Sequence, residues 1–261
     1  MSKLVRPGPT RGGLWLSRRQ VLTGIGAGLG GLILSGCDKL RPDSGPVRAS
    51  ERFNKVVQHA LFRAGAELHP GADALTPEGM FPSGHYMITV DAHGNKATPV
   101  IPADWRLKIG GNVQRPLSLS VEDLMKLPRT DSRIEHHCVE GWSAVADWHG
   151  VRLSDLAQAA GAGDGDYVEF KSFDRGPSQM TDNIVNYWSS WDRDSAMHAQ
   201  TLIAYGMNNK PLELAHGAPA RLYGAVKLGY KQVKWLTEIN FVDTETGGYW
   251  EEAGYEWYAG T

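Results

Sequence analysis

From residue 86 onward the chain alternates short apolar runs with turn residues, and this pattern restricts the fold more than any other feature of the sequence. Each run is rich in β-branched or aromatic side chains and is bounded by Gly, Pro, Asp or Asn, which is typical of strands. The predicted strands are Tyr86–Val90, Arg106–Gly110, Arg133–His137, Tyr167–Phe173, Leu202–Tyr205, Ala220–Val226 and Val233–Val242. The aromatic tail at 247–258 is expected to fold back over the domain, because so many rings would not remain in water.

Two helices are predicted among these strands. The first covers Ser120–Leu127, where Ser120 and Asp123 resemble a capping box. The second covers Ser154–Ala160 and is followed by Gly161, a residue type that commonly ends helices. Strands mixed irregularly with few helices predict an α+β fold with mixed β-sheets, not a regular βαβ array.

The first 36 residues predict an export signal. They contain five basic residues and no acidic residue, and the segment 17–22 (Ser-Arg-Arg-Gln-Val-Leu) is a twin-arginine pattern. The apolar stretch Val21–Leu34 has 14 residues, fewer than the ~20 that span a bilayer, so a signal core fits better than a membrane helix. The tetrad at 34–37 (Leu-Ser-Gly-Cys) resembles a lipobox, in which Cys37 becomes lipidated. A basic disordered N-terminus, or a plain cleavage site with an incidental cysteine, is the alternative.

These features divide the chain into three parts. Residues 1–36 are expected to be a twin-arginine lipoprotein signal peptide. Residues 37–75 are expected to be a lipid-anchored tether with an amphipathic helix at Glu51–Leu68, and residues 76–261 the folded domain. The mature protein is expected in the periplasm, anchored to the inner membrane through Cys37, because Asp38 resembles a retention signal for that membrane.

The charge balance argues against a nucleic-acid partner. The chain has 27 Lys and Arg residues and 29 Asp and Glu residues. Removal of the five basic residues of the leader leaves 22 against 29, a formal net charge of −7. Nucleic-acid binding needs a basic face, whereas an acidic surface suits a basic electron-transfer partner.

Cys138 is the most informative residue, because the chain contains only one other cysteine, Cys37. If Cys37 carries lipid, Cys138 has no partner for an intramolecular disulfide, which excludes a disulfide-stapled fold. Zinc is weakly supported: His136 and His137 precede Cys138 on a predicted strand and would point to opposite faces, and no second ligand pair follows. An inert core cysteine, a Cys/His nucleophile and a ligand to a softer metal remain open.

The segment Cys138–Ser143 (Cys-Val-Glu-Gly-Trp-Ser) resembles the Cys-x-x-x-Trp-Ser segment of the sulfite oxidase superfamily, closest to its branch of periplasmic methionine-sulfoxide reductase catalytic subunits. Three further segments resemble that family in the same order: Tyr167–Ser172, His216–Leu222 and Gly229–Leu236. The chain departs from the pattern twice. His216 stands where the reductase branch has Asn, and the Arg-Asn-His segment of true sulfite oxidases is not found. The resemblance implies a sulfite oxidase-type molybdopterin-binding fold.

The resemblance also implies molybdenum bound to one molybdopterin, with Cys138 as the thiolate ligand to the metal. A soft thiolate suits a molybdenum–oxo centre. Glu140 would pass protons to or from an oxo or hydroxo ligand, with capping of the turn an equal alternative. The other cofactor contacts are expected from the side chains of Ser172, His216, Arg221 and Lys234 and from the backbone N–H groups of Gln232 and Val233.

Arg221 and Lys234 carry the expected phosphate site. A buried pterin phosphate needs fixed positive charge, which a planar guanidinium and a compact ammonium would supply. The alternative for both residues is an ordinary surface salt bridge. Phe81 and Tyr86 lie in the segment from which the family draws further pterin contacts. An aromatic cluster would line a substrate funnel or pack in the core: Tyr187, Trp188 and Trp191.

The implied activity is oxygen-atom transfer on a small S- or N-oxide or a sulfite-like substrate. The sequence contains no C-x-x-C-H haem site and no iron–sulfur cysteine set, so electrons are expected to pass to or from a membrane haem-b subunit or a soluble cytochrome. Two other classes of function stay open. They are a cofactor-free periplasmic binding lipoprotein and a Cys-dependent hydrolase that uses Cys138.

Overall fold

The computed structural model describes residues 74–77, 79–81, 88–91 and 93–261, together with six positions between 49 and 57. The expected signal peptide, Cys37, most of the helix Glu51–Leu68 and the start of the strand Tyr86–Val90 lie outside the described residues. The chain divides into two units, residues 1–54 and 55–261, and all the named strands belong to the second. Among the described residues, no helix has the length and apolar character needed to cross a membrane.

One mixed sheet contains five strands. Its order is β2 (Leu117–Leu119), β1 (Leu107–Gly111), β10 (Leu236–Val242), β5 (Tyr167–Pro177) and β6 (Ile184–Asp192). The pair β1 and β10 is parallel, and the other neighbours are antiparallel. The mixed character of this sheet confirms the predicted fold class.

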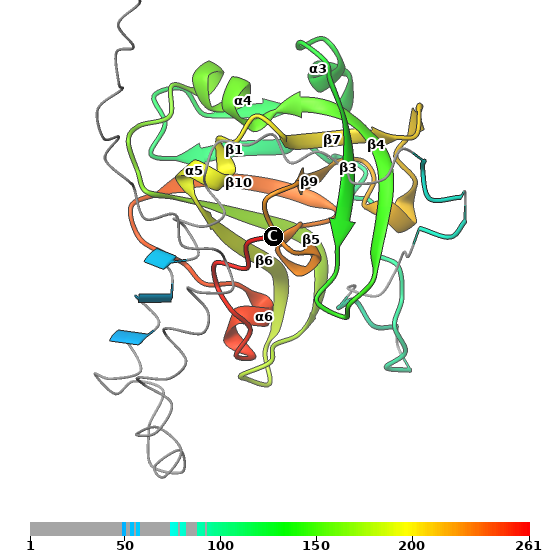
Figure 1. Cartoon of the computed structure of the whole chain (residues 1–261), viewed down its shortest axis with the longest axis vertical. Coiled ribbons are helices and arrows are strands. Elements are labelled where there is room, and N and C mark those ends of the chain that lie inside the picture. Colours follow the sequence, from blue (N-terminus) through cyan, green and yellow to red (C-terminus); the bar gives the residue numbers. More distant parts are fainter. Residues whose placement is uncertain are drawn as a thin grey trace, which may run out of the picture. The chain divides into compact units, whose positions relative to one another are not determined.

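The second sheet is antiparallel and carries the cysteine. Its strands are β3 (Thr130–His137), β4 (Ser143–Arg152), β7 (Thr201–Met207) and β8 (Lys210–Pro211), with β9 (Arg221–Gly224) also paired to β7. Strands β3 and β4 form a long hairpin, green in Figure 1, whose tip holds Cys138. The segments around β9 and β10 connect the two sheets, because Leu236 N donates to Ala220 O at 2.9 Å.

The helices are few and short. They are α3 (Val121–Met125), α4 (Leu153–Ala160), α5 (Arg193–Ala196) and α6 (Tyr249–Glu252), with 3₁₀ turns η2 (Leu214–His216) and η3 (Gly229–Lys231). Both predicted helices are confirmed, and the Ser120–Asp123 capping box has both of its hydrogen bonds. Gly161 ends α4 with φ +64°, a conformation that favours glycine.

Four strands were missing from the prediction: β2, β4, β6 and β8. Strand β4 pairs with β3 on one side and β7 on the other and is buried along most of its length, so it lacks the period-two alternation that signals a strand. The predicted strand Val233–Val242 was too long. It begins at Leu236, because Trp235 has φ +52°, outside the extended region.

The aromatic tail folds back onto the domain as predicted. Trp257 and Tyr258 are buried, and Lys227 forms an isolated β-bridge with Gly260. In Figure 1 the red end of the chain lies beside the orange segment that follows β9. The tail therefore packs against the segment that leads to Gln232, Val233 and Lys234.

Candidate functional site

Cys138 lies in a tight turn between β3 and β4. Its backbone N–H donates to Trp142 O, and Gly141 N donates back to Cys138 O, each at 3.0 Å. Gly141 has φ +88°, which explains why glycine occupies this position. Cys138 is 6% exposed, and its sulfur accepts a hydrogen bond from Glu140 N at 3.3 Å. The backbone N–H therefore orients the sulfur within the turn.

Glu140 connects the thiol to the neighbouring tryptophan. Its Oε2 atom lies 3.9 Å from the Cys138 sulfur and accepts a hydrogen bond from Trp142 Nε1 at 3.1 Å. The Glu140 carboxylate therefore both supports the turn and lies beside the thiol. Both expected roles of Glu140, turn support and proton transfer, are compatible with this geometry.

His136 is buried two residues before Cys138. Its Nδ1 lies 3.1 Å from the Tyr223 hydroxyl on β9, and its ring stacks on Trp142 at 5.3 Å. A Cβ atom at Gly229 would lie 2.5 Å from His136 Nε2, so only glycine leaves room for the imidazole. Burial, and then the nearby charge of Arg221, lower the pKa of His136 to about 3, so the imidazole is neutral.

Arg221 is a buried cation. Its Nη1 donates to His216 O at 2.9 Å, and its guanidinium carbon lies 5.0 Å from the ring centres of both Trp148 and Tyr223. Among the described residues no carboxylate lies within ion-pair distance of it. Burial lowers its pKa to about 10, which still leaves it charged at neutral pH. An uncompensated buried charge is costly, so an anion bound beside Arg221 would stabilise it.

Lys234 adds a second cation beside Arg221. Its ammonium donates to Ala215 O at 3.2 Å and lies 4.3 Å from the Trp235 ring centre. Burial, and then the Arg221 charge, lower its pKa to about 7, while Asp174 opposes this shift. The described residues provide no ion-pair partner for Lys234 either. An anion bound beside Lys234 would favour the charged ammonium.

His216 lies next to these two cations, since its carbonyl accepts the hydrogen bond from Arg221 Nη1. It ends the turn η2, and Gly217 follows with φ +106°, where a Cβ atom would lie 2.9 Å from Lys234 Cβ. Burial, and then Arg221, lower the pKa of His216. Phe81 packs edge-on against His216 at 5.6 Å and lies 5.7 Å from the His136 ring. Arg221, Lys234 and His216 together form what we call the basic cluster.

Ser172 supports the basic cluster through the backbone. Its hydroxyl lies 2.7 Å from Lys234 O and 3.1 Å from Trp235 O, and it accepts a hydrogen bond from Asp174 N at 2.9 Å. The side chain is fully buried. Ser172 thus fixes the carbonyl of Lys234, and its contact with a pterin stays a prediction.

The backbone of Gln232 is already engaged. Its N–H donates to Gly229 O at 3.0 Å, and its side-chain amide donates to Gly224 O and Lys227 O. Val233 is fully buried, and its carbonyl accepts a hydrogen bond from Leu222 N at 2.8 Å. The structure therefore places Gln232 in the expected segment but gives its N–H an internal acceptor.

A cavity of about 390 Å³ opens beside the basic cluster, a volume within the range of small-molecule sites. Its lining includes Phe81, Met207, Asn208, Lys210, Glu213 and His216. His216 belongs both to this cavity and to the basic cluster, so a ligand of extended shape would reach the two together.

The donors around Arg221 fit a phosphate-bearing pterin. The Trp148 Nε1 atom is buried without a hydrogen-bond partner among the described residues, and Arg221 uses its N–H groups only for backbone carbonyls there. An anionic, sulfur-rich metal cofactor requires hydrogen-bond donors, positive charge and a thiol ligand. The site provides these donors, two cations without counter-charges among the described residues, and a buried thiol.

Three contributors to the site escaped sequence reasoning: His136, Trp148 and Tyr223. The spacing of His136 held a usable signal, because residues two apart on a strand share a face, and Cys138 follows at that interval. Trp148 and Tyr223 gave no such signal in the sequence, because their ring stacking at 3.8 Å depends on the pairing of β4 and β9 with β7.

Comparison with known proteins agrees with this reading. The family model described as oxidoreductase molybdopterin binding domain matches residues 93–250. The chain is 32% identical to a putative protein-methionine-sulfoxide reductase subunit YedZ1 of Azospira oryzae, over 89% of this chain and 84% of that protein. It is 38% identical to a protein-methionine-sulfoxide reductase catalytic subunit MsrP of Xanthomonas axonopodis, over 57% of this chain and 48% of the relative.

Among solved structures, sulfane dehydrogenase SoxCD from Paracoccus pantotrophus matches 61% of this chain and 45% of its own, with a TM-score of 0.51 and 24% identity. That likeness concerns the fold alone. The family model covers more than half of the chain, and the relative from Azospira covers most of it. The chain therefore belongs to the molybdopterin-binding oxidoreductases of the sulfite oxidase superfamily, and it is an oxidoreductase whose cofactor is molybdenum-molybdopterin.

Proposed function

We propose that this enzyme catalyses oxygen-atom transfer on a small sulfoxide or related S- or N-oxide, with Cys138 as the thiolate ligand to molybdenum. The observation that carries the proposal is the buried Arg221, which has no counter-charge among the described residues and lies on β9, where the Tyr223 hydroxyl is 3.1 Å from His136 of the cysteine hairpin. A phosphate on the cofactor would supply that counter-charge. The names of the relatives from Azospira and Xanthomonas support a sulfoxide as substrate.

The residues of the chain have separate tasks in this proposal. Arg221 and Lys234 bind the pterin phosphate, since a planar fork and an ammonium together neutralise a dianion. His216 and Ser172 contact the pterin, and Gln232 and Val233 present backbone next to the phosphate. When bound, the cofactor supplies two-electron oxygen-atom chemistry at its metal.

Cys138 and Glu140 act at the metal end of the site. The Glu140 N–H donates a hydrogen bond to the Cys138 sulfur at 3.3 Å and so orients the proposed metal ligand. The Glu140 carboxyl group would relay a proton at this end of the site, since its Oε2 lies 3.9 Å from the Cys138 sulfur. Proton delivery to the oxygen that leaves a sulfoxide is the step that such a carboxylate assists.

The location and the electron partner form a further part of the proposal. The twin-arginine pattern and Cys37 support export and lipid anchoring at the periplasmic face of the inner membrane. A surface of formal net charge −7 after removal of the leader supports docking of a basic cytochrome or of a membrane haem-b subunit. Electrons would enter one at a time from that partner.

The test begins with cofactor content. Native enzyme and the Cys138→Ser variant are produced in a host that makes molybdopterin, and molybdenum and pterin are measured per chain. Methionine sulfoxide and an N-oxide are then offered with reduced viologen dye, and sulfite with an oxidised acceptor. We expect about one equivalent of each component and sulfoxide-dependent dye oxidation in native enzyme only. Native protein without molybdenum, or full turnover by Cys138→Ser, would overturn the proposal.

A further inference from the structure

Two lysines outside the basic cluster are buried completely, and unlike Arg221 and Lys234 they have carboxylate partners. Lys227 Nζ lies 2.8 Å from Asp192 Oδ1, and Lys231 Nζ pairs with Glu251 Oε1. Both ammonium groups have side-chain exposures of 0%. Two buried ion pairs side by side are unusual enough to require a reason, because each ion loses its hydration.

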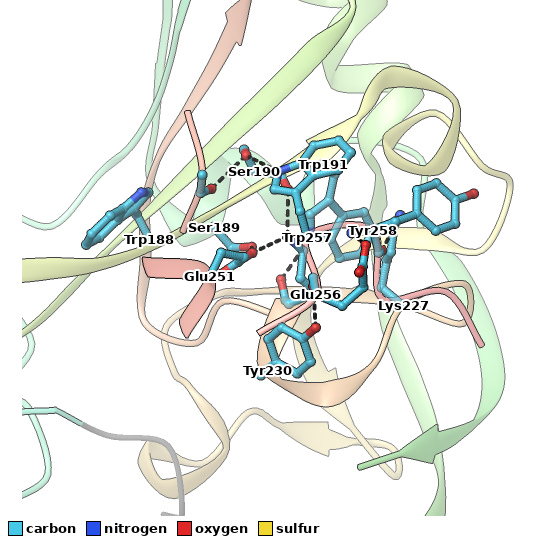
Figure 2. Close-up of polar contacts among 12 residues, drawn as sticks. Trp188, Ser189, Ser190, Trp191, Lys227, Tyr230, Glu251, Glu256, Trp257 and Tyr258 are labelled. Carbon is cyan, nitrogen blue, oxygen red and sulfur yellow. Dashed lines mark hydrogen bonds and ion pairs between the residues drawn. The ribbon is translucent and has the colours of Figure 1, made fainter. Parts of the chain in front are cut away.

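Each lysine joins three segments of the chain. Figure 2 shows Lys227 beside Tyr258. The segments are the end of β6, the loop at 225–231 and the strap, our name for residues 249–261. Lys227 also donates to Tyr258 O at 2.7 Å and lies 3.4 Å from the Tyr258 ring centre. Lys231 donates to Ser190 O at 2.9 Å and lies 5.2 Å from the Trp257 ring centre. Both ammonium groups are therefore bound to β6 and to the strap.

Other contacts fasten the strap to the same loop. Leu228 N donates to Ala259 O at 2.9 Å, and Thr261 Oγ1 donates to Ala225 O at 2.6 Å. The Tyr230 hydroxyl donates to Glu256 O, a contact visible in Figure 2. The strap thus contacts the loop from Ala225 to Lys231.

Strand β6 also donates hydrogen bonds to the loop. Trp191 Nε1 donates to Lys231 O at 2.9 Å, and the Tyr187 hydroxyl donates to Tyr230 O. Trp257 Nε1 in turn donates to Ser190 Oγ at 2.9 Å, which ties the strap to β6 directly. Two rings of the aromatic cluster, Tyr187 and Trp191, are thereby assigned to support of the loop.

The loop leads without a break into the expected cofactor ligands. Gln232 N donates to Gly229 O, and the Gln232 side chain donates to Lys227 O at 2.8 Å. Gly229 also lies against His136, two residues before Cys138. A displacement of the loop would therefore move both the phosphate-binding segment and the wall behind the thiol.

We propose that the strap is a latch that holds the loop at 225–231, and hence Gln232 to Lys234, in the geometry that retains the cofactor. Lys227 and Lys231 are positioning residues in this device. Buried ion pairs add little net stability compared with apolar replacements, but their directed hydrogen bonds fix one arrangement of the segments that they join. The inference rests on the proposed function, because it takes residues 232–234 as cofactor contacts.

The experiment measures how fast holoenzyme loses its cofactor. Purified native enzyme is diluted at constant temperature, and the molybdenum that stays with the protein is followed over time. The main variant is the double substitution Lys231→Met with Glu251→Leu, which removes both charges and leaves no buried ion unpaired. Lys231→Met alone and the milder Trp257→Phe are measured beside it. Leu124→Ala, a cavity in α3 away from the loop, is the matched control for lost stability.

We expect the double variant to lose molybdenum at least about tenfold faster than native enzyme while its melting temperature changes little. Trp257→Phe should show a smaller acceleration. Leu124→Ala should lower the melting temperature and keep the native rate of cofactor loss.

Equal rates of loss in native enzyme and the double variant would overturn the latch alone. Leu124→Ala losing cofactor as fast as the strap variants would also overturn it, because general destabilisation would then explain the effect. Native protein that carries no molybdenum would overturn the proposed function and the latch with it. If Lys231→Met fails to fold, the double variant and Trp257→Phe decide the question.

Discussion

His136 Nδ1 lies 3.1 Å from the hydroxyl oxygen of Tyr223, and this contact joins the strand that leads to Cys138 to the strand that carries Arg221. Both side chains are buried. The contact therefore sets the spacing between the expected metal ligand and the expected phosphate ligand, although Arg221 follows Cys138 by 83 positions in the sequence.

Tyr223→Phe should destabilise the protein. It leaves a buried imidazole nitrogen without its partner, at a cost of about 1–3 kcal/mol in the free energy of unfolding. Urea unfolding of the cofactor-free protein measures this value. Tyr205→Phe is the control, since Tyr205 lies on the neighbouring strand β7 and packs edge-on against His149. A Tyr223→Phe variant as stable as the control would contradict the assigned role of the hydroxyl.

Arg221→Gln should separate cofactor binding from stability. The substitution removes a buried cation that lacks a counter-charge, so the cofactor-free protein should keep or gain thermal stability. Cofactor affinity should fall by about 2 kcal/mol or more, because a buried charge partner of the phosphate is lost. Arg221→Lys keeps the charge without the planar fork and should be intermediate. Molybdenum content and melting temperature are the measurements, and a normal molybdenum content in Arg221→Gln would refute this assignment.

The low pKa of Lys234 should appear in the pH dependence of stability. Burial and Arg221 lower this pKa from 10.5 to about 7, so between those values the unfolded chain binds more protons at Lys234 than the folded chain. The free energy of unfolding of cofactor-free protein should therefore rise with pH across that window. Lys227, whose pKa is lowered to about 8 chiefly by burial, contributes in the same direction.

The contribution of Lys234 is isolated by a pair of variants. In Lys234→Met the rise in stability from pH 7 to pH 9 should be less steep than in native protein. Lys126→Met removes an exposed lysine at the C-terminal end of α3, and its stability should rise with pH as steeply as that of native protein. Parallel pH profiles for native protein and Lys234→Met would show that Lys234 titrates normally.

Gly229→Ala should disturb the wall behind the thiol. The new Cβ atom would lie 2.5 Å from His136 Nε2 and 2.9 Å from its Cε1, so the imidazole must move. Overpacking of this kind costs about 1–3 kcal/mol. Gly163→Ala is the control, because its nearest neighbour would be Asn112 O at 3.4 Å, an ordinary contact. Denaturant unfolding of both variants provides the comparison, and equal stability would mean that the ring has room to give way.

Glu140→Gln should slow turnover without loss of cofactor. The amide oxygen can still accept the hydrogen bond from Trp142 Nε1, so the turn should persist, but the group can no longer carry a proton. Loss of general acid catalysis typically lowers the rate about 10²–10⁴-fold. The measurements are kcat for sulfoxide reduction and molybdenum per chain. Unchanged kcat would assign Glu140 to support of the turn alone.

Much of this protein follows from local sequence. The capping box at Ser120 and the glycine after α4 depend on neighbouring residues, and both helices were predicted correctly. Cys138 and the four segments that resemble the family are also local patterns. Strand β4 was missed for the opposite reason, because its pattern reflects burial by two neighbouring strands and not alternation along its own length.

The sequence by itself determined the fold class, the family and the residue types that a molybdenum-pterin site needs. It did not determine which cations have counter-charges. Arg221 and Lys227 are both buried bases in the same stretch, yet Asp192 neutralises only Lys227, from 35 residues away in the chain. Charge compensation depends on which distant segments meet and on how completely they exclude water. Only the tertiary structure therefore distinguished the buried cations without a counter-charge among the described residues from those that are paired with carboxylates.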